Sequence, residues 1–365
     1  MKRRPAHFLL PLAAFGLLAS ACGESASTLT TLPPVAPRVA VTSVKGDNTS
    51  ALLAAIFARL LEDAGFRVAR KDPVELDRAG YYAALQAGEF QLIPDFSGDL
   101  MKFLYSQPGA PTAPTTVVPS GPATTQAPIT IPTTTVPPTT VAGDTVPASA
   151  ASTTQVPITA APTTTLPTPV MNGRTTAAQV KAIRDAIAST VAIDDGLLAE
   201  SKRVIACTEA AMKANENTQL FTLTNLASIA PNIRIGGSAE FLADTESGFP
   251  ALQQFYGGDW APTVTVDAAG LAGAIEKGTA DCFAVDSLDP IITNKKLTII
   301  VDDKVMVPSN AAIALVSSSV ATPDLIAAID TLIASLTTER LNQMLVQVNG
   351  GTAPSVVADA FMATL

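Results

Sequence analysis

Two stretches of the chain share one pattern: a helical segment that ends at glycine, a short apolar run, and a carboxylate at the end of that run. The first stretch covers residues 83–98 and carries Asp95, and the second covers residues 274–289 and carries Asp286. A glycine after such a segment is typical of a helix end, and the apolar run has the length of a buried strand. Ligands bind beyond the carboxyl ends of strands in open α/β sheets, so the pattern predicts two α/β lobes that face one cleft. Ordinary helix-to-strand succession produces the same pattern, and that interpretation stays open.

The segments between these stretches support an α/β fold. The order strand, helix, strand, helix, strand over residues 39–96 predicts a parallel sheet, with Asn48 as the expected N-cap of the first helix. Further strands are expected at residues 204–207, 233–236, 297–301 and 311–316. Further helices are expected at residues 177–190 after Thr175 or Thr176, at 223–230, and after Thr322, Leu336 and Ala353.

A long interruption divides the sequence. Residues 107–170 hold 14 of the 28 prolines and abundant threonine, with no aromatic residue and Asp144 as the sole charge. Such a composition cannot bury a core, and its prolines favour an extended, solvated backbone. We therefore expect a disordered Thr/Pro-rich insertion over residues 107–175, with threonines available for glycosylation.

The first residues have the layout of an export signal. Lys2, Arg3 and Arg4 precede an apolar run over residues 8–18, and small residues follow before Cys22. This predicts a signal peptide over residues 1–21. The small residues before Cys22 resemble the lipobox of bacterial lipoproteins, which implies a lipid on Cys22, a tether over residues 22–34 and anchoring outside the cytoplasmic membrane. A soluble secreted protein with an incidental Cys22 is the alternative.

Composition excludes several kinds of chemistry. The single histidine, His7, lies in the predicted signal, so the mature chain would lack histidine-based catalysis and most zinc or copper sites. Removal of the signal takes the formal net charge from −9 to −12, because three cationic residues leave with it. An acidic chain without clusters of Lys and Arg is a poor nucleic-acid binder. We expect no cofactor and no bound metal.

Two cysteines remain in the globular part. Cys207 and Cys282 would work in an oxidising compartment, where they either form a disulfide between neighbouring strands or stay as two buried thiols. Both possibilities stay open at this point.

Three blocks of sequence resemble the substrate-binding proteins of glycine betaine, choline and carnitine ABC importers. Residues 60–68 follow a loop that contains Lys45, and residues 87–98 are similar to the family's G-E-I-D-L-Y-P-E-Y-T-G. The third block, residues 235–257, is similar to F-G-G-x-x-E-F followed by G-Y-P-G-L-x-x-x-Y-G. The resemblance covers residues 39–106 and 176–365.

This resemblance implies a two-lobed periplasmic-binding fold of type II with the ligand between the lobes. The first lobe would combine residues 35–106 with 290–365, and the second would cover residues 176–289. Lobe closure would hinge near residues 105–176 and 286–292. The implied partners are a small-molecule ligand, a membrane permease and its ATPase subunits, with the binding protein itself a monomer.

Site residues are inferred by carrying the family's positions onto this chain. Lys45 matches a lysine that contacts a carboxylate, and Phe96 takes the place of one cage tyrosine. Asp286 and Asp99 stand where the family carries an aromatic residue and a threonine. If Asp95, Asp99 and Asp286 converge, the ligand is cationic, whereas a solvated acidic rim is the alternative. The predicted ligand-binding residues are Lys45, Gly46, Asp47, Asp95, Phe96, Ser97, Asp99, Arg203, Asp286 and Ser287.

The implied function is extracytoplasmic binding of a small quaternary ammonium or other cationic osmolyte and its delivery to a permease. A degenerate binding-protein domain that acts as a sensor or as a surface-interaction protein is the alternative. An enzyme is not expected, because neither a nucleophile motif nor a phosphate-binding loop is present in the sequence.

Overall fold

The computed structural model describes residues 38–110, 173–216 and 220–365. The predicted signal peptide, the lipidation site Cys22 and the tether lie outside the described residues, as does most of the predicted insertion. None of the helices in the described ranges is long and apolar enough to span a membrane.

Both ends of the predicted insertion are described, and one end differs from the prediction. Arg174 lies within the range expected to be disordered, yet it is buried, and its guanidinium donates to the backbone oxygen of Met306. Thr175 caps the next helix, because its hydroxyl accepts a hydrogen bond from Ala178 N at 3.3 Å. Arg174 and Thr175 therefore belong to the folded part of the chain and not to the predicted insertion.

The first lobe is built on a five-stranded sheet in the order β2-β1-β3-β10-β4. Its strands are β1 (Arg38–Val41), β2 (Arg67–Arg70), β3 (Leu92–Phe96), β4 (Val191–Ile193) and β10 (Ala312–Ser317). Strands β2 and β3 pair parallel to β1, as the sequence predicts, whereas β10 is antiparallel to both β3 and β4. The chain thus leaves this sheet and re-enters it near its C-terminus.

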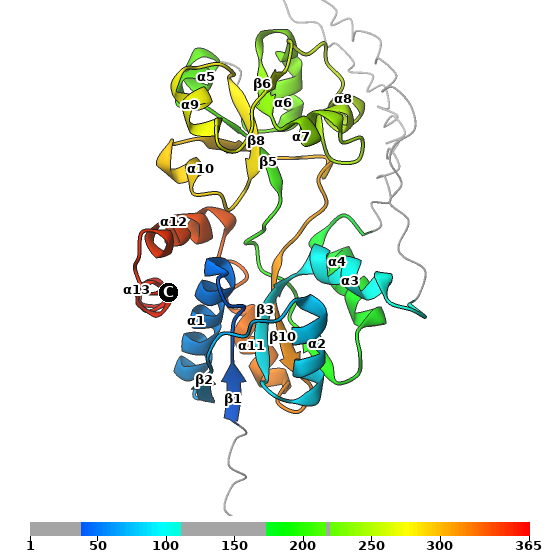
Figure 1. The fold of residues 1–365 in the computed structure, drawn as a ribbon, viewed down its shortest axis with the longest axis vertical. Coiled ribbons are helices and arrows are strands. Elements are labelled where there is room, and N and C mark those ends of the chain that lie inside the picture. The colour runs from blue at the N-terminus through cyan, green and yellow to red at the C-terminus, as the bar shows by residue number, and fades with distance from the viewer. Residues whose placement is uncertain (1–37, 111–172, 217–219) are drawn as a thin grey trace, which may run out of the picture. The chain divides into compact units, whose positions relative to one another are not determined.

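Helices cover both faces of this sheet (Figure 1). Alternate residues of β10 point to opposite faces: Ala312, Ala314 and Val316 join one buried cluster, and Ile313 and Leu315 join another. Helices α2 (Arg78–Ala87), α3 (Ser97–Ser106) and α4 (Thr176–Ala186) cover the second face. The first face is covered by α1 (Asn48–Asp63), α11 (Pro323–Asp330), α12 (Thr338–Asn349) and α13 (Pro354–Met362).

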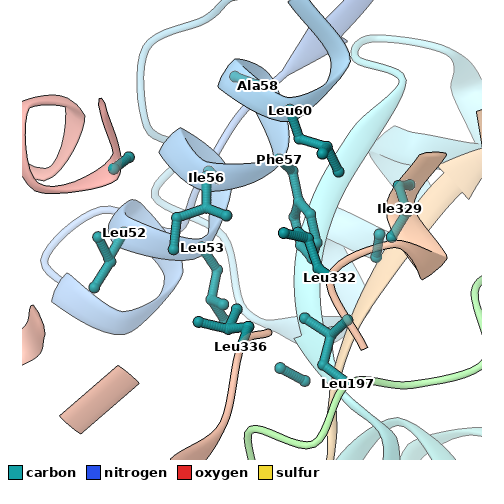
Figure 2. Close-up of a cluster of buried hydrophobic side chains, with 14 of the residues drawn as sticks. Leu52, Leu53, Ile56, Phe57, Ala58, Leu60, Leu197, Ile329, Leu332 and Leu336 are labelled. Carbon is teal, nitrogen blue, oxygen red and sulfur yellow. The ribbon is translucent and has the colours of Figure 1, made fainter. Parts of the chain in front are cut away.

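Helix α1 joins the two ends of the chain. Its buried stripe, which includes Leu53 and Phe57, packs against Leu332 and Leu336 from the segment between α11 and α12 (Figure 2). Leu197, from the segment after β4, packs into the same cluster (Figure 2). The first lobe is therefore made from both ends of the described chain, as expected.

The second lobe is built on a five-stranded sheet in the order β7-β6-β8-β5-β9. Its strands are β5 (Arg203–Cys207), β6 (Ile235–Gly237), β7 (Val264–Thr265), β8 (Cys282–Asp286) and β9 (Thr298–Ile300). Its helices are α5 (Glu209–Ala214), α6 (Leu223–Ser228), α7 (Ala239–Ala243), α8 (Phe249–Tyr256), α9 (Leu271–Glu276) and α10 (Ile291–Asn294), with a 3-10 turn at Ala230–Asn232. Cys207 lies opposite Cys282 in the antiparallel pair β5 and β8, and the two form a disulfide.

Two strands belong to other lobes than the sequence predicts. Strand β4 pairs with β10 in the first sheet, although its residues fall in the range expected for the second lobe. Strand β9 pairs with β5 in the second sheet, although its residues fall in the range expected for the first. An apolar run indicates that a strand is buried but not which sheet it joins.

The connections between the lobes therefore differ from those predicted. The chain crosses through residues 194–202, between β4 and β5, and returns through residues 301–311, between β9 and β10. The two crossings pair with each other: Glu200 bridges Ala311, and Ser201 N donates to Asn310 O at 3.0 Å. The predicted hinge ranges 105–176 and 286–292 are wrong, because the first joins α3 to α4 within one lobe and the second precedes β9 within the other.

Candidate ligand-binding cleft

The loop before α1 shapes one edge of the first lobe. Gly46 has a φ of 78°, a left-handed conformation that glycine adopts without steric cost. Asp47, and not the predicted Asn48, caps the helix: its carboxylate accepts hydrogen bonds from Thr49 N at 2.8 Å and Ser50 N at 3.1 Å. Asp47 therefore has a structural partner for its charge.

Lys45, predicted to contact a ligand carboxylate, lies elsewhere on this loop. Its ammonium pairs with the carboxylate of Glu75, and both side chains are exposed. The pair leaves Lys45 solvated at the surface.

Asp95 is the last residue but one of β3 and is buried, with 4% of its surface exposed. Arg78 Nη2 donates to its Oδ1 at 2.9 Å, Arg78 Nε donates to Oδ2 at 3.1 Å, and the Tyr81 hydroxyl donates to Oδ2 at 2.8 Å. Burial raises the pKa of the Tyr81 hydroxyl and the Asp95 charge raises it further, so Tyr81 remains a donor. The guanidinium of Arg78 thus balances the charge of the Asp95 carboxylate, which has a structural role.

A cavity of about 230 Å³ opens beside this ion pair. Phe96 and Tyr81 contribute aromatic surface to it, and Arg78 contributes a guanidinium whose side chain is 32% exposed. The remaining lining residues are Val44, Asp47, Ser50, Leu53, Leu76, Asp77, Pro94 and Asp95. The predicted residue Phe96 therefore faces a space that could receive a small group.

Two of the predicted serines are buried, and the hydroxyl of each both donates and accepts a hydrogen bond within the protein. The Ser97 hydroxyl donates to Gln179 Oε1 at 2.6 Å and accepts from Ala311 N at 2.9 Å. The Ser287 hydroxyl donates to Glu200 O at 2.6 Å and accepts from Lys202 N at 3.1 Å. Both serines tie their strand ends to the crossing segments.

Asp99 and Asp286 approach each other through residues of the crossing segments. Asn310 Nδ2 contacts Asp99 Oδ2 at 3.3 Å and Ser201 O at 2.8 Å. The Ser201 hydroxyl in turn lies 3.4 Å from Asp286 Oδ2. This chain of contacts brings one carboxylate from each lobe to the place where the crossings pair.

The two carboxylates also affect each other electrostatically. The surrounding protein displaces water from Asp286 and raises its pKa, and the charges of Asp289 and Asp99 raise it further. Hydrogen bonds from Leu288 N and Ser201 act in the opposite direction. A bound cation would relieve this repulsion.

Space for a small molecule lies next to Asp286. A hollow of about 380 Å³ separates the start of α1 from the end of β8. Its lining is polar in large part and consists of Asn48, Thr49, Ser201, Asp286, Leu288, Asp289, Pro290, Leu345 and Asn349. Of the three predicted acidic residues, Asp286 lines this hollow. Asp99 is connected to the lining residue Ser201 through Asn310. Asp95 does not line the hollow and is paired with Arg78.

Arg203 begins β5 directly opposite Asp286. Its guanidinium donates from Nη1 to Asp244 Oδ2 at 2.9 Å, lies 3.4 Å from Glu240 Oε1 and stacks 5.7 Å from the Phe241 ring centroid. The side chain is 26% exposed. Arg203 is thus held by an aromatic face and two carboxylates.

The glycine pair of the third sequence block makes room for aromatic rings. A Cβ on Gly237 would lie 2.4 Å from Phe241 Cδ1, and one on Gly236 would lie 2.8 Å from Phe283 Cδ1. Any side chain at either position would displace a ring that is almost fully buried. The motif therefore places Phe241 beneath Arg203.

Arg203 and Phe241 also border a second cavity, of about 200 Å³. Apolar groups dominate its lining, which comprises Glu200, Lys202, Arg203, Val204, Ile205, Leu223, Phe241, Ser247, Ser287, Ile299, Ile300, Val301, Asp302, Met306, Val307 and Thr338. Lys202 and Glu200 form an ion pair at 2.5 Å on its rim.

Several site residues were not foreseen from the sequence. Arg78 and Tyr81 lie three residues apart at the start of α2, a spacing that puts both on one helix face and offers the one local signal. Ser201 and Asn310 carry no such signal, because they meet only through the pairing of the two crossings. The described residues contain no group of three His, Cys, Asp or Glu side chains suited to a metal ion.

Two α/β sheets, joined by two paired crossings and meeting at polar strand ends, define a two-lobed solute-binding protein. The model of the OpuAC family, the substrate-binding domain of ABC-type glycine betaine transport systems, matches residues 38–364. The chain belongs to this family, whose members are extracytoplasmic binding components of importers and not a class of enzymes.

Solved structures agree with this fold. A crystal structure of a glycine betaine/carnitine/choline ABC transporter is 16% identical and covers 89% of this chain and 98% of its own, with a TM-score of 0.59. Apo YehZ from Escherichia coli is 17% identical and covers 90% of this chain and 99% of its own, with a TM-score of 0.63. No curated protein sequence matches the chain.

Proposed function

We propose that this substrate-binding domain takes a small organic cation of the glycine betaine and choline class into the cleft beside Asp99 and Asp286. The observation that carries this proposal is the approach of these two carboxylates, one from each lobe, through Asn310 and Ser201. A cation between them would screen the repulsion that the charge of Asp99 exerts on Asp286. The same cation would favour a closed arrangement, in which the two lobes lie nearer to each other.

Aromatic groups make a smaller contribution to the proposed site than in a full cage. Among the described residues that line cavities of the first lobe, Phe96 and Tyr81 offer ring surface, and the Tyr81 hydroxyl is engaged by Asp95. Charge attraction therefore carries more of the binding, and cation–π attraction carries less. Ligands with N–H groups gain hydrogen bonds to the carboxylates that a quaternary ammonium cannot form.

Titration calorimetry of the purified protein with choline, glycine betaine, carnitine and polyamines tests the ligand class. We expect at least one of them to bind, and we expect binding to weaken about tenfold or more in Asp286→Asn and in Asp99→Asn. Asp303→Asn is a matched control, because this exposed carboxylate bonds Thr224 in the second lobe and takes no part in the contacts that join Asp99 to Asp286. Absence of binding to every compound would overturn the ligand class and leave the family unchanged.

We also propose that the protein is exported, anchored by a lipid on Cys22, and presented as a monomer to a permease and its ATPase subunits. The charged start, the apolar run and the small residues before Cys22 support this anchor. Cys22→Ala should abolish incorporation of a radiolabelled fatty acid into the protein, because the lipid is attached to the Cys22 sulfur. Labelling of the variant equal to that of the wild type would contradict the anchor.

A further inference from the structure

Arg203 occupies a position that has the chemistry of a cation-binding site. An aromatic face lies on one side of its guanidinium, and the carboxylates of Asp244 and Glu240 lie on its edge. Aromatic faces and carboxylates are the groups that proteins use to hold organic cations. Here the cation belongs to the protein itself.

Two of the three groups around this guanidinium, Asp244 and Phe241, are held in place without it. Asp244 Oδ1 accepts from Glu246 N at 2.9 Å and from Ser247 N at 3.2 Å, and the Ser247 hydroxyl donates to Oδ2 at 2.8 Å. Burial alone would raise the pKa of Asp244, but these bonds and Arg203 together lower it, so the carboxylate keeps its charge. Removal of Arg203 would leave Asp244 with three of its hydrogen bonds.

Phe241 is fixed as firmly. It is 1% exposed, its backbone N–H is capped by the Ser238 hydroxyl at 3.2 Å, and its ring packs edge-on against Phe249 at 6.5 Å. The aromatic face would therefore remain oriented toward the place that the guanidinium now fills.

The apolar cavity of about 200 Å³ adjoins this guanidinium, because Arg203, Phe241 and Ser247 are all part of its wall. Ile205, Ile300 and Met306 extend this wall into the second lobe. A cation in place of the guanidinium would thus have space behind it for an alkyl substituent.

We propose that Arg203 is a built-in occupant of a cation seat formed by Phe241, Asp244 and Glu240, and that it sets specificity by denying this seat to ligands. Loss of its guanidinium would open a site for an organic cation, with an alkyl group directed into the adjoining cavity. This inference rests on the proposed function only in that Arg203 lies opposite Asp286, a residue of the proposed ligand site, in the pairing of β5 with β8. Ligands of the native protein are then recognised beside Asp99 and Asp286.

The test is chemical rescue of Arg203→Ala. Thermal unfolding is followed with guanidinium, ethylguanidinium and butylguanidinium chloride at equal millimolar concentrations, with sodium chloride to match ionic strength. We expect the melting temperature of the variant to fall and to be restored by the guanidinium compounds, with the apparent affinity rising roughly threefold for each added methylene. The wild-type protein should show no such dependence on chain length.

Arg234→Ala is the matched control. Arg234 is also a second-lobe arginine, paired with Asp281 at 3.0 Å, but it is involved in no described cation–π contact and lines none of the described cavities. Equal rescue of both variants, or no rescue of Arg203→Ala, would overturn the proposal. If Arg203→Ala does not fold alone, recovery on dilution from urea with butylguanidinium supports the seat, and no recovery refutes it.

These outcomes are separate from those for the ligand class. The rescue uses no transport ligand, so it can fail while choline or a polyamine still binds the native protein. It can likewise succeed while every transport ligand tested fails to bind.

Discussion

Asp95, a predicted ligand contact, has hydrogen-bond partners within the protein. Its position near the end of β3 is the one predicted. Both of its carboxylate oxygens accept hydrogen bonds, from Arg78 and Tyr81. The sequence places Asp95 correctly at a strand end, because strand and helix boundaries follow from local patterns. It could not reveal the pairing, which depends on how α2 lies against the sheet.

Arg78→Ala should therefore destabilise the protein. Without its guanidinium, the buried Asp95 carboxylate lacks a counter-charge, and we expect a loss of about 3 kcal/mol in the free energy of unfolding, measured by urea denaturation. Arg70→Ala provides the comparison, because the ion pair of Arg70 with Glu62 is solvent-exposed and should contribute much less. Similar losses in both variants would contradict the structural role of Arg78.

Asp194, the first residue of the crossing over residues 194–202, should make the free energy of unfolding depend on pH. Burial raises its pKa to about 7, although Ala314 N and Gly196 N donate to its carboxylate at 2.7 and 3.2 Å. The unfolded chain ionises near pH 4, whereas the folded protein holds the proton until about pH 7. The contribution of Asp194 to stability is therefore most favourable below pH 4, falls as the pH rises to about 7, and is level above that.

Asp194→Asn should remove this contribution. Relative to the variant, the wild-type free energy of unfolding should fall by up to about 4 kcal/mol between pH 4 and pH 7.5. Urea denaturation of both proteins across this range measures the difference, and a constant offset would show that Asp194 does not titrate as inferred.

At the scale of elements, helix starts were the most predictable feature. Thr322, Thr337 and Ala353 precede α11, α12 and α13 as expected, because threonine caps and first-turn prolines act locally. Strand β4 was missed, since its three residues carry too little pattern to stand out. The antiparallel return of β10 between β3 and β4 is set by chain topology, which no local pattern encodes.

The disulfide that joins β5 to β8 should stabilise the second lobe. It connects cysteines 75 residues apart, and closing a loop of that length in the unfolded chain is worth about 2–4 kcal/mol. We expect the double variant Cys207→Ala/Cys282→Ala to unfold at correspondingly lower denaturant. Reductant should weaken the wild-type protein and leave the double variant unchanged; an equal effect on both would contradict the assignment.

At the scale of the whole molecule, Asn342 couples the lobes. This buried amide on α12 donates to Ser287 O at 3.1 Å and to Asp289 O at 2.8 Å, and it accepts from the Thr293 hydroxyl at 2.6 Å. Its bonds thus hold the segment after β8, which carries Asp286, against a helix of the first lobe.

Asn342→Ala should loosen that segment. We expect faster hydrogen exchange over residues 286–294 and a loss of about 1–3 kcal/mol in stability, because the Ser287 and Asp289 backbone oxygens and the Thr293 hydroxyl lose their partner. Asn349→Ala is the control, since Asn349 makes an exposed amide contact with Asn48 at 2.6 Å. Unchanged exchange over residues 286–294 in Asn342→Ala would show that the coupling lies elsewhere.

The position of β10 in the first sheet also sets the order in which the two sheets can be completed. This strand lies between β3 and β4, yet its residues are among the last 54 of the chain, and α11, α12 and α13 follow it. During synthesis, the first sheet lacks the strand that joins β3 to β4 until residues 312–317 have emerged. The strands of the second sheet, which span residues 203–300, emerge before that. The first sheet is consequently the later of the two to be completed.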